Sequence, residues 1–156
     1  MILDTEGQAK NVVKMLIDKG LTISTAESCT GGLLAAMLTE VPGASKVINE
    51  CIVTYSNEAK MRELCVPEEI INKFGAVSYD TAEKMAKGIC KKTGADIGVA
   101  ITGIAGPDGG SDEKPVGTVF VGICVMGRVS VYELHLKGER STIRYETCRF
   151  VLETLA

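Results

Sequence analysis

Histidine is almost absent, with His135 alone among 156 residues. A metal site built from several histidines is therefore excluded, and a Ser-His-Asp hydrolase would have to use this one residue. Long hydrophobic runs are absent too, since no tract approaches the ~20 apolar residues that span a bilayer. The six cysteines include no CxxC pair, and for the five other than Cys29 this favours buried thiols in a core over metal ligation.

An excess of charge of either sign is also missing. Lys and Arg number 17 against 20 for Asp and Glu, a net charge of −3. This balance does not support non-specific binding to the phosphate backbone of a nucleic acid, although a local basic group can still bind a small acidic ligand. The N-terminal Met1–Asp4 lacks a basic region and an export signal, so we expect a cytoplasmic protein with reduced thiols and with no membrane or nucleic-acid partner.

The hydrophobic pattern predicts one domain over residues 1–156 with alternating strands and helices. Helices are expected over 5–19, 33–39, through Lys60 to 64, from Pro67, from a cap at Ser78 or Asp80, and from about 141. Strands are expected over 21–26, 48–55, 95–102, 116–126 and 129–136, with Gly127-Arg128 as a hairpin turn. This order favours a three-layer α/β/α sandwich with a mixed, mostly parallel sheet and one antiparallel hairpin.

Three segments that follow predicted strands could carry chemistry, because ligands favour the carboxyl ends of parallel strands. The first is TAESCTGG, residues 25–32. A hydroxyl between a strand and a helix lies beside unpaired N–H groups and the positive helix end, where an oxyanion or a phosphate could be held. The alternative is that Ser28 or Thr30 only caps the helix, and this segment alone favours that alternative.

The second segment is TYSNEAK, residues 54–60. Lys60 falls in the first turn of a helix, where the dipole and any burial lower the pKa of its amine. A neutral lysine can act as a base. The commoner alternative is an exposed lysine paired with Glu58 or Glu63, while Tyr55 could belong to the core or offer its hydroxyl to a ligand.

The third segment, residues 102–118, contains four glycines among eight residues after a buried strand. Its N–H groups could form an anion-binding concavity. The segment is neither a Walker loop nor a GxGxxG loop, and its acidic residues do not have calcium-loop spacing. A flexible surface loop is an equally good interpretation.

Together, TAESCTGG, TYSNEAK and TGIAGPDGGSDEKPVGT, followed by Gly138-Glu139-Arg140, resemble the C-terminal domain of the CinA family. The resemblance covers nearly the whole chain in the right order. It implies an α/β/α amidohydrolase that converts nicotinamide mononucleotide to nicotinate mononucleotide and ammonia. It also implies a homodimer with a small-molecule nucleotide substrate and without an obligatory metal, so we expect no cofactor.

By this resemblance Ser28 is the nucleophile, Lys60 its base and Tyr55 a further catalytic residue. Thr102 and Arg140 match family site residues, and we expect Arg140 to bind the substrate phosphate, with Arg144 as an alternative. The remaining expected substrate-binding residues are Cys29, Thr30, Gly31, Gly32, Gly103, Gly106, Gly109 and Gly110.

Two other functions stay open at this stage. Cys29 adjoins Ser28 and could serve as a thiol nucleophile at the same helix end. Alternatively, the domain is a non-catalytic regulatory module that binds a nucleotide or phosphate with the same loops.

Overall fold

The computed structural model describes residues 5–156; Met1–Asp4, on which the cytoplasmic expectation partly rests, lie outside the described residues. The helices are α1 (Glu6–Lys19), α2 (Leu33–Thr39), the short 3-10 helix η2 (Ala44–Lys46), α3 (Asn57–Leu64), α4 (Glu68–Phe74), α5 (Tyr79–Thr93) and α6 (Arg140–Leu155). The strands are β1 (Ile23–Glu27), β2 (Ile48–Val53), β3 (Ile97–Gly103), β4 (Thr118–Val125) and β5 (Arg128–His135). None of the helices among residues 5–156 is long and apolar enough to cross a membrane.

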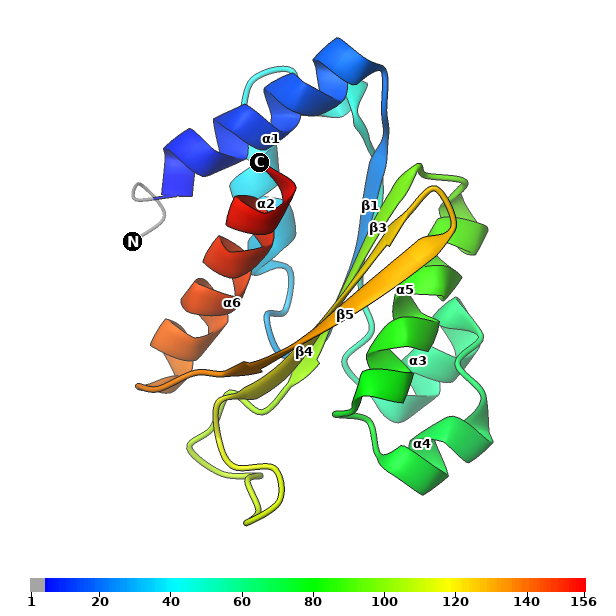
Figure 1. Cartoon of the computed structure of the whole chain (residues 1–156), viewed down its shortest axis with the longest axis vertical. Coiled ribbons are helices and arrows are strands. Elements are labelled where there is room, and N and C mark those ends of the chain that lie inside the picture. Colours follow the sequence, from blue (N-terminus) through cyan, green and yellow to red (C-terminus); the bar gives the residue numbers. More distant parts are fainter. Residues whose placement is uncertain (1–4) are drawn as a thin grey trace.

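The five strands form one sheet in the order β2-β1-β3-β4-β5 (Figure 1). Strands β2, β1 and β3 are parallel neighbours, β4 is antiparallel to β3, and β5 is antiparallel to β4. Only β4 therefore runs against the other strands. The predicted mixed, mostly parallel sheet with an antiparallel hairpin is confirmed.

Helices cover both faces of this sheet, with α1, α2 and α6 on one side and α3, α4 and α5 on the other (Figure 1). Side chains alternate along β3: Val99 and Ile101 belong to the core cluster beneath the first group, and Ala100 belongs to the cluster beneath the second. A strand that is covered on both sides needs apolar residues at both odd and even positions, because alternate side chains face opposite sides of the sheet. This explains the continuous apolar run in β3. The three-layer sandwich is thus confirmed.

The hairpin turn lies one residue earlier than predicted. Val125 pairs with Arg128, so the turn residues are Met126 and Gly127, not Gly127 and Arg128. Both have positive φ, 50° and 85°, as a type I′ turn requires. An exposed methionine adopts this conformation because the type I′ twist matches that of the flanking strands.

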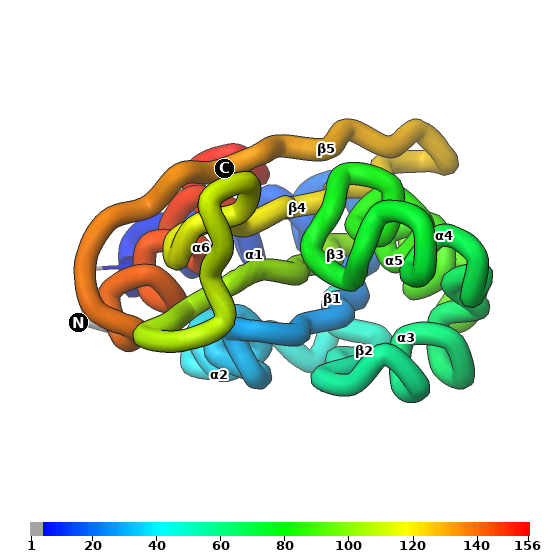
Figure 2. Tube along the Cα trace, turned by 90° about the horizontal axis from the view of Figure 1, so that it is seen from below, coloured from blue at the N-terminus to red at the C-terminus, as the bar shows by residue number. Residues whose placement is uncertain are grey.

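The loop after β1, the β3–β4 loop and the start of α6 lie at the same end of the molecule (Figure 2). This is the end at which β1 and β3 have their carboxyl termini. The segments predicted to carry chemistry are therefore brought together by the parallel part of the sheet.

Candidate active site

A cavity of about 270 Å³ opens at this end of the sheet. Nine of the predicted site residues line it: Ser28, Cys29, Tyr55, Lys60, Thr102, Gly103, Gly106, Gly109 and Arg140. Four others do not line it: Thr30, Gly31, Gly32 and Gly110. Of the predicted TAESCTGG residues after Glu27, only Ser28 and Cys29 therefore lie at the cavity, because the chain turns away from it after Cys29.

Ser28 and Lys60 meet inside the cavity. Lys60 Nζ lies 3.1 Å from Ser28 Oγ, and it also lies 2.9 Å from the Thr54 carbonyl oxygen and 3.3 Å from that of Tyr55. A neutral amine has two N–H donors and one lone pair. This set of partners suits it, since two carbonyls accept its protons and the serine O–H can donate to the lone pair.

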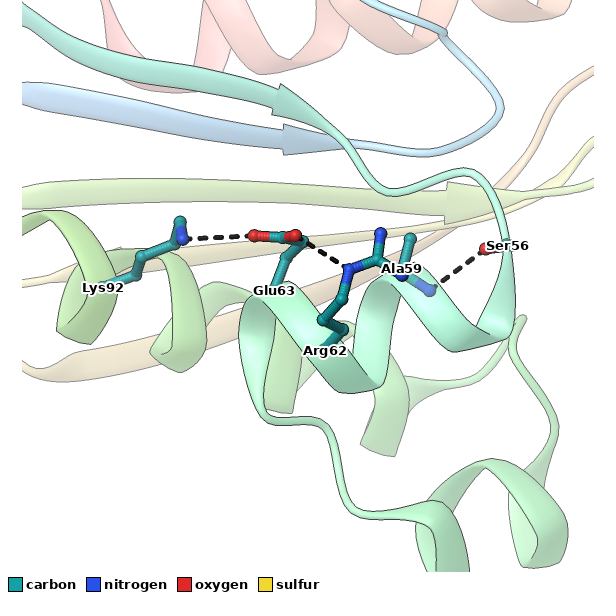
Figure 3. Close-up of polar contacts among 5 residues, drawn as sticks. All are labelled: Ser56, Ala59, Arg62, Glu63 and Lys92. Carbon is teal, nitrogen blue, oxygen red and sulfur yellow. Dashed lines mark hydrogen bonds and ion pairs between the residues drawn. The ribbon is translucent and has the colours of Figure 1, made fainter.

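Lys60 is 1% exposed, and its burial lowers the pKa of its amine, an effect that the nearby Cys29 opposes only in part. The expected alternative, an exposed lysine paired with an acidic neighbour, is wrong. Glu63 instead accepts hydrogen bonds from Arg62 at 3.0 Å and from Lys92 of α5 at 3.2 Å (Figure 3). In the part of the chain that the structure describes, Lys60 forms no ion pair.

Helix α3 places Lys60 because its start is well defined. Ser56 caps the helix, and its side chain accepts a hydrogen bond from the Ala59 N–H at 3.0 Å (Figure 3). Lys60 then lies one turn into the helix with a buried side chain, which is long enough to reach Ser28 just after the end of β1.

The N-terminus of α2 is already occupied from within the protein. The Glu27 carboxylate, 1% exposed, accepts hydrogen bonds from the N–H groups of Leu34 and Ala35, each at 3.0 Å. Neither Ser28 nor Thr30 caps this helix, so that alternative is wrong. A ligand anion cannot bind at this helix end either, because the Glu27 carboxylate already accepts the hydrogen bonds of the Leu34 and Ala35 N–H groups.

Ser28 sits at the start of a tight turn. Its N–H donates to the Ile101 carbonyl of β3 at 3.0 Å, and its own carbonyl accepts from the Gly31 N–H at 3.0 Å. Arg144 holds the two carbonyls between: its Nε donates to the Cys29 oxygen at 3.1 Å, and its Nη2 donates to the Thr30 oxygen at 2.8 Å. Arg144 is not part of the cavity lining, and its guanidinium contacts the carbonyl side of this turn.

Tyr55 and Arg140 lie at the rim of the cavity. Tyr55 is 59% exposed, and its hydroxyl accepts a hydrogen bond from Arg140 Nη2 at 3.2 Å. Arg140 Nη1 donates to the Gly106 carbonyl at 2.8 Å. The Tyr55 hydroxyl thus faces Arg140, and it is the Tyr55 carbonyl that contacts Lys60. This placement argues against a direct proton relay from the Tyr55 hydroxyl.

The segment after β3 is held at its base and is not a free surface loop there. The Ile104 N–H donates to Thr118 at 2.9 Å, and the Gly117 N–H donates back to Ile104 at 2.8 Å. Gly106 has φ of 80°, and a Cβ there would lie 2.5 Å from a Val116 methyl group, so only glycine fits. Thr102, at the end of β3, donates its hydroxyl to the Ala76 carbonyl at 2.7 Å and thereby ties the α4–α5 connection to the cavity.

Neither Cys29 nor His135 offers an alternative nucleophile-base set. Burial raises the pKa of the Cys29 thiol to about 11, which leaves little thiolate at neutral pH. His135 is exposed at the end of β5, 3.5 Å from Glu133, and does not line the cavity. Among residues 5–156, no three His, Cys, Asp or Glu side chains are grouped so as to hold a metal ion.

Sequence reasoning missed six residues of the cavity lining, which are Asn57, Ala76, Val77, Ile104, Ala105 and Asp108. Asn57 and Asp108 carry polar groups suited to substrate hydroxyls, and each lies inside a motif that was singled out. Ala76 and Val77 come from the α4–α5 connection, which has no motif. The hydrogen bond from Thr102 to Ala76 holds this connection at the site.

Comparison with known proteins agrees with this architecture. The chain matches the family described as the CinA C-terminal domain over residues 5–156. A CinA-like protein of Dictyoglomus turgidum is 56% identical over 136 residues, which are 87% of this chain and 33% of the relative. The crystal structure of the competence/damage inducible protein CihA from Agrobacterium tumefaciens has 45% identity and a TM-score of 0.95, covering 97% of this chain and 93% of that one.

A CinA superfamily protein from Klebsiella pneumoniae has 36% identity and a TM-score of 0.94, covering 97% of this chain and 94% of that one. The chain spans about a third of the length of the curated relatives that it matches. The match to the family nonetheless extends over every residue that forms the cavity. The chain belongs to the CinA family, and its sequence corresponds to the C-terminal domain of that family.

Proposed function

We propose that this domain is an amidohydrolase that deamidates nicotinamide mononucleotide to nicotinate mononucleotide and ammonia, with Ser28 as nucleophile and Lys60 as base. One observation carries the proposal: a buried lysine, which has no acidic partner among residues 5–156, lies 3.1 Å from a serine hydroxyl inside a cavity. A lysine in this setting loses its proton more readily, and an amine in contact with an alcohol can activate it.

The first half of the reaction acylates the enzyme. Lys60 Nζ takes the Ser28 proton as Oγ attacks the carboxamide carbon, and the carbonyl electrons move to the oxygen. The tetrahedral intermediate collapses, the C–N bond breaks, and the Lys60 ammonium gives its proton to the departing amide nitrogen, which leaves as ammonia. The cationic pyridinium ring withdraws electrons from the amide, so the carbon is a better electrophile than that of a peptide.

The second half releases the acid. Water attacks the acyl ester while Lys60 accepts a proton from it, and Ser28 Oγ leaves and regains its proton from Lys60. The oxyanion in both halves of the reaction needs nearby N–H donors. Ser28 and Cys29 both line the cavity, but the Ser28 N–H already donates to Ile101, so we assign this role to the Cys29 N–H. The Gly31 N–H is not available for this role, because it donates to the Ser28 carbonyl.

The substrate phosphate is proposed to bind at the rim. Arg140 is exposed there, and its planar guanidinium can exchange the Tyr55 hydroxyl for two phosphate oxygens. The glycine-rich segment after Thr102 reaches the same rim, since the Gly106 carbonyl accepts a hydrogen bond from Arg140. A mononucleotide would thus lie with its ring near Ser28 and its phosphate near Arg140.

Incubation with nicotinamide mononucleotide, with ammonia release and conversion of amide to acid followed by mass spectrometry, tests the proposal. We expect turnover by the wild type and none by Ser28→Ala or by Lys60→Arg, because arginine does not deprotonate in proteins. Both variants should keep the wild-type circular dichroism spectrum. Binding of the nucleotide by calorimetry without any product would favour the regulatory-module alternative, and normal turnover by Ser28→Ala would remove Ser28 from the mechanism.

A further inference from the structure

Arg144 contacts the loop that carries the proposed nucleophile and does not contact the cavity. Its guanidinium reaches from α6 across 114 and 115 positions of sequence to the carbonyl oxygens of Thr30 and Cys29. These are the two central residues of the turn that the Ser28 carbonyl closes with the Gly31 N–H. Two hydrogen bonds from one planar group fix two successive peptide groups.

We propose that Arg144 is a positioning residue for acyl transfer at Ser28, which holds this turn in the shape that catalysis needs. The proposal rests on the proposed function only in taking Ser28 as the nucleophile. Because the C=O and N–H of a trans peptide point in opposite directions, drawing the Cys29 carbonyl toward α6 turns the Thr30 N–H away from it. The bond between the Ser28 carbonyl and Gly31 fixes the direction of the Cys29 N–H in the same way.

The N–H groups whose directions are fixed in this way, those of Cys29 and Thr30, are the ones in the turn that remain able to bind an oxyanion. Among the described residues, neither the Cys29 N–H nor the Thr30 N–H donates to a backbone carbonyl, whereas those of Ser28 and Gly31 do. The guanidinium at the Thr30 carbonyl polarises the Thr30–Gly31 peptide group, and the N–H of that group holds the Ser28 carbonyl and so fixes the direction of the Cys29 N–H, the donor assigned above to the oxyanion. Arg144 therefore favours an oxyanion at Ser28 without touching it.

Glu27 fixes the same segment through a second set of hydrogen bonds. It directly precedes the Ser28–Gly31 turn, and its carboxylate binds the N–H groups of Leu34 and Ala35, which follow the turn. A turn that is held at both ends does not need to reorganise when charge develops on the substrate oxygen, which is the condition for electrostatic catalysis. An arginine that served only to stabilise the fold would have no need to bind the two carbonyls that follow the nucleophile.

Phosphonylation of Ser28 by an alkyl fluorophosphonate tests the proposal without relying on the nucleotide. In this step Oγ bonds to phosphorus, fluoride leaves, and the serine proton passes to Lys60; intact mass gives the rate. We expect labelling to slow about tenfold in Arg144→Lys, which keeps the charge but not the planar pair of donors, and about a hundredfold in Arg144→Met. The midpoint of the pH profile should stay at the wild-type value, because Lys60 and its partners are unchanged.

Arg149→Lys is the matched control, since Arg149 lies on the same helix and pairs only with Glu146 and Glu153 at the surface. It should label like the wild type. Equal labelling rates for folded Arg144→Lys, Arg144→Met and wild type would overturn the positioning role and leave the amidase proposal intact. A slowdown confined to Arg144 variants in a protein that does not turn over nicotinamide mononucleotide would support the positioning role and overturn the substrate assignment. No labelling of the wild type at Ser28 would overturn both.

Discussion

The inner wall of the cavity and its rim are built in different ways. On the inner wall, Ser28 and Lys60 are 8% and 1% exposed, and each is held by hydrogen bonds to backbone groups. At the rim, Tyr55 is 59% exposed, and Arg140 holds it through one hydrogen bond between side chains. The reacting groups are thus fixed by the sheet and its neighbouring loops, while the groups proposed to recognise the phosphate can exchange partners when a ligand arrives.

Lys60→Met should produce the largest effect, because it removes the base from the inner wall. We expect turnover of nicotinamide mononucleotide to fall by about a thousandfold or more, as for the loss of a general base. The stability to urea should not fall, since methionine fills a similar volume without an amine that must be desolvated. Ammonia release and urea denaturation measure the two effects.

Lys92→Met is the control for this substitution, because Lys92 is a partly exposed lysine of α5 that pairs with Glu63 of α3 (Figure 3). It should change turnover little. Normal activity in the Lys60→Met protein would contradict the role of Lys60 as base, and with it the assignment of the reacting groups to the inner wall.

Arg140→Lys should have an intermediate effect that appears mainly in KM. Lysine keeps the charge but loses the bidentate geometry toward phosphate, so we expect KM to rise about tenfold and kcat to change little. Tyr55→Phe removes only the hydroxyl that Arg140 contacts and should change KM less. Steady-state kinetics across nucleotide concentrations separate the two constants; a collapse of kcat at unchanged KM would place Arg140 with the reacting groups.

Cys29→Ala should have the smallest effect on activity. The thiol is buried with a pKa raised to about 11, so it contributes no nucleophile at neutral pH. We expect turnover to stay within about threefold of wild type and the stability to fall by about 1 kcal/mol from the small space left behind. Loss of ammonia release in a folded Cys29→Ala protein would revive the cysteine hydrolase as an explanation.

Much of this arrangement could be predicted from the sequence, because it depends on local patterns. Apolar periodicity located the strands and helices, and the three motifs that follow β1, β2 and β3 converge because parallel strands end at one edge. The placement of the hairpin turn failed by one residue, since Met126-Gly127 and Gly127-Arg128 offer similar turn chemistry and only the strand register decides between them.

Long-range polar contacts could not be predicted. The bonds from Arg144 to Cys29 and Thr30, and from Arg140 to Tyr55, span 85 to 115 positions and depend on how α6 packs against the sheet. The role of Glu27 was also hidden, because its side chain caps a helix that begins six residues later, whereas Ser28 and Thr30 have more typical capping side chains. Local propensity shows which side chains are suited to cap a helix, but tertiary packing decides which of them does so.

The central claim is that Lys60 meets Ser28 as an uncharged amine. A direct NMR titration of the Lys60 side-chain amine, assigned by its loss in Lys60→Met, tests this claim alongside the pH dependence of kcat/KM. Because burial lowers its pKa, the amine should titrate below its ordinary value of 10.5, and activity should be lost as pH falls through the same midpoint. A Lys60 amine that titrates at or above 10.5, or activity that persists well below its measured midpoint, would contradict the account.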